Sequence, residues 1–340
     1  MIGPIVLKRQ ILFLTFTAVL CLTSCKTTDS GTQNEVKAKE FSTQLESPIP
    51  ERLIELGEKY REAGDSLKAL DYFNTAIKIN PSYAPAYTYR GMLYMRIKAY
   101  TKAVKDFEKA VKLTPNPNPK KSEDLMAYLL YGFCHYQLGN YEQAIFVFSQ
   151  TIGINPYYAD VYNFLGLSYF NLKQYEQALE EYTSAIHFGE IVKSAQDAYY
   201  LNRGRTYGVL GDYEKAIADF TKSIELKADV AEVYAERGYA YNLLEKYDKA
   251  LNDFTQALLL ESRLTTAYIG CGIVYYNMGK YEESVDSFTK AEKISPSVYV
   301  YVGRGMALTR LAKYEAAIND FNQALKLKPM DERIHKMRGI

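Results

Sequence analysis

The sequence has 340 residues but no tryptophan, only three histidines and only four cysteines. So few imidazole and thiol groups leave little material for a metal site, and we expect neither a metal ion nor another cofactor. The 41 basic and 40 acidic side chains nearly cancel, so no basic field is available to hold nucleic acid. Charged residues make up 24% and apolar residues 48%, which excludes a disordered chain. Tyrosine, in contrast, is in excess, with 32 residues.

The first residues have the pattern of an export signal. Lys8 and Arg9 form a positive flank ahead of the uncharged run 11–22. A run of this length spans about 18 Å as a helix, short of the ~30 Å hydrocarbon core of a bilayer, so a transmembrane anchor is not expected. We interpret residues 1–24 as a signal peptide.

The uncharged run ends in Leu22-Thr23-Ser24-Cys25, which resembles the lipobox of bacterial lipoproteins. In that family the Cys is lipidated and becomes the new N-terminus, so the resemblance implies a lipid anchor at Cys25. An ordinary signal peptide followed by a chance Cys is the alternative. Because Lys26 rather than Asp follows the Cys, the resemblance to Gram-negative lipoproteins favours the outer membrane of the bacterial cell envelope.

The next segment, 26–49, is rich in polar residues and shows no apolar periodicity. We expect residues 25–49 to be the lipidated Cys and a flexible tether, with an r.m.s. reach of about 25–30 Å. Without residues 1–24 the chain keeps 39 basic and 40 acidic side chains. The lipid, rather than the net charge, is therefore expected to hold the protein at a membrane.

The remainder of the chain repeats one pattern eight times. Aligned on a glycine, most units carry Tyr four residues before it, Tyr three residues after it, Ala twelve after it and Phe sixteen after it. The first three positions share one face of a helix, and the last two share one face of a second helix. Each unit is therefore predicted to be a pair of helices. The glycines are Gly57, Gly91, Gly132, Gly166, Gly204, Gly238, Gly272 and Gly305.

These columns resemble the tetratricopeptide repeat, from about Pro50 to Met330. The resemblance implies an all-α fold, a right-handed α-solenoid of about eight helix-turn-helix repeats with a concave inner face. Because one unit cannot bury its own faces, the units are expected to be stabilised by stacking on one another. Over residues 50–331 we number as units 1 to 8 the segments 50–83, 84–117, 125–158, 159–192, 197–230, 231–264, 265–297 and 298–331, followed by a short C-terminal capping helix in 332–340.

The repeat also accounts for other features of the composition. Of the 32 Tyr, 21 fall in columns of the pattern, which predicts scaffold positions rather than an aromatic ladder for nucleic acid or sugar. Glycines between the two helices of a unit are expected at positive φ, where they close a helix. They are Gly64, Gly139, Gly211 and Gly279.

Two columns vary together within the chain. In units 2, 5, 6 and 8 the residue before the repeat glycine is Arg, and the residue sixteen positions further on is Asp. Because the two helices of a hairpin would bring these positions side by side, we predict ion pairs within units; a row of Arg for an anionic ligand is the alternative. The pairs are Arg90 with Asp106, Arg203 with Asp219, Arg237 with Asp253, and Arg304 with Asp320.

Residues for catalysis are not grouped in the predicted solenoid. The three His lie in different parts of it, and His135 falls in a Tyr column, which predicts a packed histidine rather than a ligand. Cys134 and Cys271 lie four units apart, well beyond the ~7 Å Cα limit for a disulfide. We see no carboxylate pair placed for acid–base chemistry, so no catalytic residue is assigned and the protein is not expected to be an enzyme.

The resemblance further implies where partners bind. The carboxylate clamp of some tetratricopeptide domains matches none of the units 1 to 5 in which we sought it. In this family the inner face is lined by first-helix positions one and four residues after the repeat glycine, and these are mostly apolar here. We predict an apolar groove, strongest over units 2 to 4, with Asn and Arg side chains that fix polar groups of a ligand. The alternative is that curvature buries these side chains between units. The candidate groove residues are Met92, Met95, Phe133, Tyr136, Asn163, Leu167, Phe170, Asn202, Arg205, Tyr239 and Tyr276.

Taken together, the sequence predicts a membrane-anchored scaffold or adaptor that binds protein or peptide partners on its concave face. Because the sequence does not identify the partner, an envelope assembly factor and a chaperone-like peptide binder remain open alternatives. A second class, an enzyme or sugar-binding protein with the solenoid as its frame, would require a cluster of carboxylates or His, or an extra domain.

Overall fold

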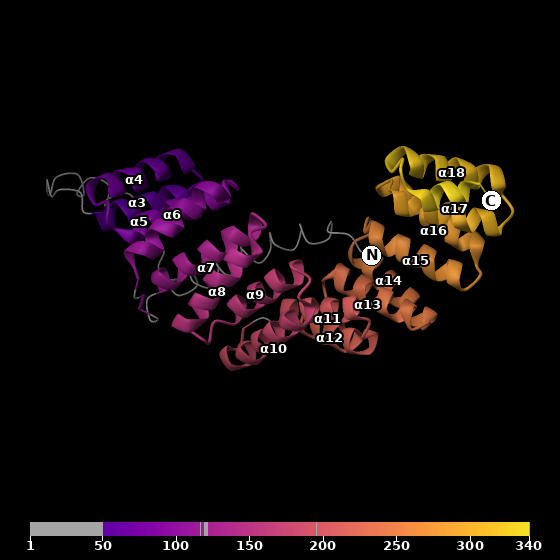
Figure 1. Cartoon of the computed structure of the whole chain (residues 1–340), viewed down its shortest axis with the longest axis horizontal. Coiled ribbons are helices and arrows are strands. Elements are labelled where there is room, and N and C mark those ends of the chain that lie inside the picture. Colours follow the sequence, from indigo (N-terminus) through magenta and orange to yellow (C-terminus); the bar gives the residue numbers. More distant parts are fainter. Residues whose placement is uncertain (1–49, 116, 119–121, 195, 340) are drawn as a thin grey trace, which may run out of the picture. The chain divides into compact units, whose positions relative to one another are not determined.

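The computed structural model describes residues 50–339 apart from 116, 119–121 and 195, and apart from the side chains of 122–124. The predicted signal peptide, Cys25 and the tether lie outside the described residues. Residues 50–340 form a compact unit of their own (Figure 1), and all that follows concerns this unit.

All regular structure in the described residues is α-helical, which confirms the predicted fold class. Each of units 1 to 8 corresponds to two helices, and the first helix of unit 3 begins three residues before the predicted start of that unit. In order these are α3 (Pro50–Glu62) and α4 (Ser66–Ile79), α5 (Ala84–Arg96) and α6 (Tyr100–Leu113), α7 (Ser122–Gln137) and α8 (Tyr141–Ile154), α9 (Ala159–Asn171) and α10 (Tyr175–Val192), α11 (Asp197–Leu210) and α12 (Tyr213–Leu226), α13 (Ala231–Leu243) and α14 (Tyr247–Leu260), α15 (Thr265–Asn277) and α16 (Tyr281–Ile294), and α17 (Val298–Arg310) and α18 (Tyr314–Leu327), with α19 (Glu332–Arg338) after them.

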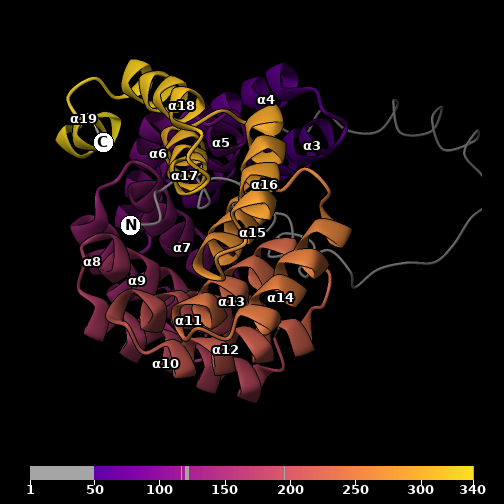
Figure 2. The ribbon, with the colours of Figure 1, turned by 90° about the vertical axis from the view of Figure 1, so that its right-hand side faces the viewer.

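The first helices of the units line the inner side of the solenoid. Each of them packs on the first helices of the neighbouring units, as in the series α3, α5, α7 and α9, whereas second helices make no comparable contact with one another in the described unit. Because first helices lie closer together than second helices, the stack curves toward them. Figure 2 shows α9, α11 and α13 nearer the centre of this curve than α10, α12 and α14.

The turns inside the units confirm the glycine prediction. Gly64, Gly139, Gly211 and Gly279 have φ between 76° and 85°. The other four units have non-glycine residues at the same position, also at positive φ. The same left-handed turn therefore joins the two helices in all eight units.

A buried aromatic ring fixes the spacing of the two helices in each unit. A Cβ added at any of the eight repeat glycines would come within 3.0 Å of the ring sixteen residues further on. In unit 6 that ring is Phe254, which is fully buried. A Cβ added at Gly270 of unit 7 would also lie 2.3 Å from the Phe254 ring, so one phenylalanine fills the space between two consecutive units.

All four predicted Arg–Asp pairs form, which confirms the hypothesis of ion pairs within units. The shortest N–O distances are 2.6 Å for Arg90–Asp106 and 2.8 Å for the other three pairs. In each pair Nε and Nη2 of the Arg donate to the two carboxylate oxygens of the Asp. The Asp side chains are at most 8% exposed, so these bidentate pairs are buried more deeply than surface ion pairs.

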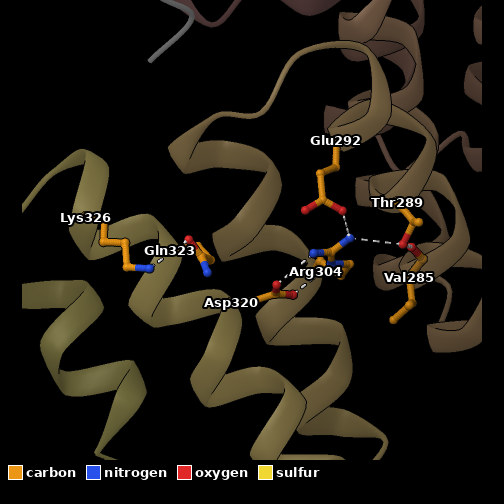
Figure 3. A network of polar contacts seen from close by, with 7 residues as sticks. All are labelled: Val285, Thr289, Glu292, Arg304, Asp320, Gln323 and Lys326. Atoms are coloured by element: carbon orange, nitrogen blue, oxygen red, sulfur yellow. Dashed lines mark hydrogen bonds and ion pairs between the residues drawn. The ribbon is translucent and has the colours of Figure 1, made fainter.

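Each of these arginines also contacts the preceding unit. Nη1 of Arg237 donates to Thr221 Oγ1 at 3.0 Å, and Arg90, Arg203 and Arg304 make equivalent bonds to Asn74, Thr183 and Thr289. Figure 3 shows Arg304 between Asp320, Thr289 and Glu292. The guanidinium of each Arg further lies over the Tyr three residues before it, at 5.5–5.9 Å from the ring centroid. We call this arrangement the arginine clamp.

Unit 4 has a carboxylate at the Asp position but no arginine. Glu181 stands where the clamps have Asp, and Leu165 stands where they have Arg. Burial, together with Glu180, raises the pKa of Glu181 to about 7. A carboxylate at this position that has no arginine partner is therefore harder to ionise than an ordinary Glu.

Both cysteines of the described unit are free and buried, as the sequence predicts. Burial raises the pKa of Cys134 to about 12 and that of Cys271 to about 11. These thiols act as small apolar side chains at neutral pH.

His135 is packed in the core of unit 3, also as predicted, and is 9% exposed. Its ring lies edge-on to Tyr131, and neither ring nitrogen has a hydrogen-bond partner in the described part of the chain. Burial lowers the pKa of His135, and Glu108 opposes this only in part. The folded protein therefore disfavours the imidazolium.

From this we predict a loss of stability below about pH 6.5, where the unfolded chain takes up a proton on His135 before the folded chain does. His135→Tyr restores the residue found in six other units and removes the titration. Its stability gain over the wild type should grow as pH falls from 7 to 5, measured by urea unfolding at each pH. A gain that does not vary with pH would contradict this assignment.

The C-terminal helix α19 covers the end of unit 8. Ile334 is buried in the same cluster as Leu308, Phe321 and Leu325. Nη1 of Arg338 donates to Asn322 Oδ1 at 3.1 Å, sixteen residues away, which repeats the bond of Arg90 to Asn74. The helix thus follows the register of a first helix.

Candidate functional site

The predicted groove residues fall into two groups in the structure. Six are partly exposed on the first helices, namely Met92, Met95, Phe170, Arg205, Tyr239 and Tyr276. Five are buried, with exposed fractions of 8% or less, namely Phe133, Tyr136, Asn163, Leu167 and Asn202. For Phe133, Tyr136 and Leu167 the structure shows the alternative left open by the sequence, in which side chains one and four residues after the repeat glycine are buried between units.

The buried aromatic residues form part of the core between units 3 and 4. The Phe133 ring packs edge-on to Phe164 at 5.4 Å, and Phe164 stacks on Phe148 at 5.8 Å. Nδ2 of Asn171 donates to the hydroxyl of Tyr136 at 3.3 Å. Removing Phe133 or Tyr136 would therefore disturb the packing of α7 on α9, and loss of binding by such a variant would not identify a groove.

The polar residues predicted to hold a ligand instead bond to neighbouring first helices. Asn202 Nδ2 donates to Asn163 Oδ1 at 2.9 Å, and Arg205 Nε donates to Glu236 Oε1 at 2.9 Å. The Tyr239 hydroxyl donates to the backbone carbonyl of Thr266 at 2.6 Å. These bonds join α9 to α11, α11 to α13, and α13 to α15.

A half-buried carboxylate belongs to the same series. The hydroxyl of Tyr199 on α11 donates to Asp160 Oδ1 on α9 at 2.6 Å. Burial raises the pKa of Asp160, against the opposing effect of this hydrogen bond. Further along, Asn277 Nδ2 donates to Asn242 Oδ1 at 3.0 Å. The inner face thus carries hydrogen bonds that join the first helices of consecutive units, and we call this series of bonds the polar ladder.

The sequence-based search missed a short apolar stretch beside this ladder. Asn171 and Asn277 lie five residues after the repeat glycine, and the equivalent residues of units 5 and 6 are Val209 and Leu243. Their exposed fractions are 53% and 55%. We call Phe170, Gly208, Val209 and Leu243 the inner shelf. The signal that was available is an apolar residue in two consecutive units at a position that is polar or charged in the other six.

Gly208 leaves the inner shelf open. A Cβ added at this helical glycine would meet no atom within 4 Å. The position four residues after the repeat glycine carries a larger side chain in all other units. A bound segment can therefore come close to the backbone of α11 at this point.

One hollow on the described unit does not coincide with the predicted groove. A hollow of about 360 Å³ is lined by Arg237, Tyr241, Asp248, Lys249, Asn252 and Asp253. Arg237 and Asp253 in its wall are paired in a clamp. Within the described residues, no group of three or more His, Cys, Asp and Glu side chains could bind a metal ion, and no helix is long and apolar enough to cross a bilayer.

Comparison with protein families supports the repeat assignment. Sequence models described as tetratricopeptide repeat match residues 54–117, 198–229, 231–263, 265–298 and 298–330. A further model, described as anaphase-promoting complex, cyclosome, subunit 3, matches residues 96–185. The curated UDP-N-acetylglucosamine–peptide N-acetylglucosaminyltransferase of Giardia intestinalis is 32% identical over 74 residues, which are 22% of this chain and 5% of that enzyme.

Solved structures share the fold at low sequence identity. An APC/C hetero-tetramer chain matches with a TM-score of 0.58 and 17% identity over 81% of this chain, which spans about half (52%) of that chain's length. A tetratricopeptide repeat protein of Parabacteroides merdae matches with a TM-score of 0.52 and 18% identity, over 85% of this chain and 97% of that one. PilF of Pseudomonas aeruginosa matches with a TM-score of 0.54 and 15% identity, over 64% of this chain and 94% of that one. The helix pairs, the repeat glycines with their aromatic partners and the matching family models together show that this chain is built of tetratricopeptide repeats.

Proposed function

We propose that the protein is a scaffold that binds a polypeptide partner on the inner face of its solenoid, with the inner shelf as the main apolar contact. The observation that carries this is the pair Val209 and Leu243, more than half exposed on consecutive first helices beside the open position of Gly208. Apolar side chains in such positions gain free energy when a partner covers them. The repeat fold, which presents an extended concave surface, supports the same proposal.

The polar ladder determines which residues we assign to partner binding. Because Asn163, Asn202 and Arg205 are already hydrogen-bonded across units, they hold the first helices in place rather than being reserved for a ligand. We therefore assign specificity to the partly exposed residues around the shelf, above all Phe170. A partner segment with two or three apolar side chains would match this surface.

A steric block tests the site without disturbing the core. Gly208→Tyr places a ring in open space on the inner shelf and should weaken partner capture by about 2 kcal/mol or more, as expected for a central interface position. Ala218, on the outer helix α12 of the same unit, is the matched control, because it is also helical and exposed. Capture is measured with a photo-reactive amino acid at position 209 in cells, followed by mass spectrometry of the adducts.

Two results would overturn the proposed site. Unchanged adducts in a folded Gly208→Tyr variant would show that the partner does not cover the shelf. Equal loss with Ala218→Tyr would show that the effect comes from bulk anywhere on the solenoid. Circular dichroism of both variants checks that the helices are intact.

We further propose that a lipid on Cys25 anchors this scaffold at the bacterial cell envelope, with the outer membrane favoured. The support is the sequence pattern of Leu22-Thr23-Ser24-Cys25 and the absence of Asp after it. Envelope assembly, or chaperone-like binding of peptides, fits the same architecture. An inner face held by paired polar groups gives no support to an enzymatic or sugar-binding role.

Cys25→Ala tests the anchor. The variant should lose lipidation and leave the membrane fraction, or accumulate unprocessed, because one thiol is the acceptor of the lipid. Fractionation and the intact mass of the mature protein provide the measurement. An unchanged mature mass with unchanged membrane partition would contradict lipidation at Cys25.

A further inference from the structure

One outer helix of the solenoid carries a row of lysines that no other unit has. Counted from the repeat glycine, positions 7, 11, 14, 18 and 21 are exposed in unit 2, and all five are Lys. The other seven units have at most two Lys at these positions. Four of the five follow the three- and four-residue spacing of a helix face along α6, and the first lies in the turn before that helix. It consists of Lys98, Lys102, Lys105, Lys109 and Lys112.

Acidic residues near the row do not cancel it. Asp106 on the same helix is buried in the clamp with Arg90. Glu108 pairs with Lys112 at 2.6 Å, and the Lys102 ammonium lies over the Tyr94 ring at 5.6 Å. The row therefore keeps a net positive charge although the chain as a whole is close to neutral.

The outer helix of the next unit continues this surface without charge. The five equivalent positions of unit 3 are all exposed, namely Gly139 in the turn and Gln143, Phe146, Gln150 and Gly153 on α8. Phe146 is 59% exposed. The one charged residue on α8 is Glu142 in its first turn. The outer faces of units 2 and 3 thus combine a cationic row with an exposed aromatic ring.

We propose that the outer faces of α6 and α8 lie on an anionic lipid surface, with the lysine row on the headgroups and Phe146 at their level. Lysines near anionic headgroups are attracted over about one Debye length, and an aromatic ring is favoured at the interface. The inference rests on the proposed anchor at Cys25, whose tether would supply an effective concentration of the order of mM. This orientation leaves the inner shelf on the opposite side of the units, open to a partner.

The test uses the full chain reconstituted in lipid nanodiscs, either of phosphatidylcholine alone or of two parts phosphatidylcholine to one part phosphatidylglycerol. Acetylation of each lysine is followed by mass spectrometry. In anionic discs at low salt, all five lysines of the row should react at least about threefold more slowly than in neutral discs, and high salt should abolish the difference. Exposed lysines of α12 and α14, namely Lys215, Lys222 and Lys249, should react equally in both.

Variants make the result specific to the row. In the triple variant Lys102→Gln, Lys105→Gln and Lys109→Gln, the two remaining lysines of the row should lose their protection. The matched triple variant Lys215→Gln, Lys222→Gln and Lys249→Gln should keep it. Equal reaction rates in the two lipid compositions would overturn the proposal. Protection in discs made from native membranes, but not in the discs of phosphatidylcholine and phosphatidylglycerol, would overturn it in favour of an acidic protein.

A separate measurement distinguishes a missing lipid anchor from a lysine row that does not bind lipid. A chain that does not float with either kind of disc contradicts the lipid anchor at Cys25. In that case co-sedimentation of Cys25→Ala protein with anionic vesicles, compared with the same protein carrying the α6 triple substitution, tests the lysine row alone. A difference of at least about tenfold in partitioning between the two proteins supports the row, and equal partitioning overturns it.

Discussion

Replacing Phe254 by alanine is expected to lower the free energy of unfolding by about 3–5 kcal/mol, the usual cost of removing a large buried ring. The ring is fully buried and lies against Gly238 of its own unit and Gly270 of the next. Tyr239 packs edge-on to it at 5.0 Å. The other buried residues of this cluster are largely alanines, which have no side-chain length to fill the space that the substitution leaves.

The effect should be local as well as large. Because contacts run between neighbouring units, hydrogen exchange should accelerate most in α13 to α15, with less change in α3 and α4. Phe146→Ala provides the matched control, since that ring is 59% exposed, and its cost should stay below about 1 kcal/mol. Similar losses for the two variants in urea unfolding would refute the assignment of Phe254 as a shared core residue.

The second large effect is expected for the clamp of unit 6. Asp253 is 2% exposed and accepts two hydrogen bonds from Arg237. Asp253→Val keeps the size of the side chain but leaves the guanidinium without its carboxylate. We expect a loss of about 3 kcal/mol, because a buried charge that loses its partner is costly.

The chain itself contains the control for this experiment. Unit 3 has Tyr131 and Val147 at the two clamp positions, so the fold accepts an uncharged pair there. The double variant Arg237→Tyr with Asp253→Val copies that pair into unit 6 and should come within about 1 kcal/mol of the wild type. A double variant as unstable as the single one would mean that the charge on Arg237 is not the source of the loss. Urea unfolding of the three proteins under one set of conditions provides the comparison.

Features that repeat along the chain were predictable from sequence. The Arg and Asp columns change together in four units, and hairpin geometry then requires the two positions to meet, as in Arg203 and Asp219. The turn glycines and the aromatic column follow in the same way, because glycine recurs at the turn in four units and an aromatic ring recurs in all eight. Repetition thus makes up for the weakness of any one local signal.

Features that depend on the angle between neighbouring units were not predictable in the same way. The position after the repeat glycine is buried as Phe133 in unit 3 but partly exposed as Tyr239 in unit 6. The sequence pattern assigns both residues to one face and contains no information on how closely the next unit approaches. Val209 and Leu243 were not predicted as groove residues, because the prediction used only the two positions that line the inner face in this family. Nothing in the described residues tests Cys25.

The arginine clamps also make some joints between units stiffer than others. Each clamp crosses a joint, since Arg90, Arg203, Arg237 and Arg304 bond to the unit before their own. The joints entering units 3, 4 and 7 have Tyr131, Leu165 and Cys271 in place of the arginine. A change in the pitch of the solenoid would therefore occur by rotation of neighbouring units at these three joints. Units 4 to 6, which are joined by clamps, would move as one segment. The inner shelf lies within that segment, so its shape would be preserved while the solenoid changes pitch around a partner.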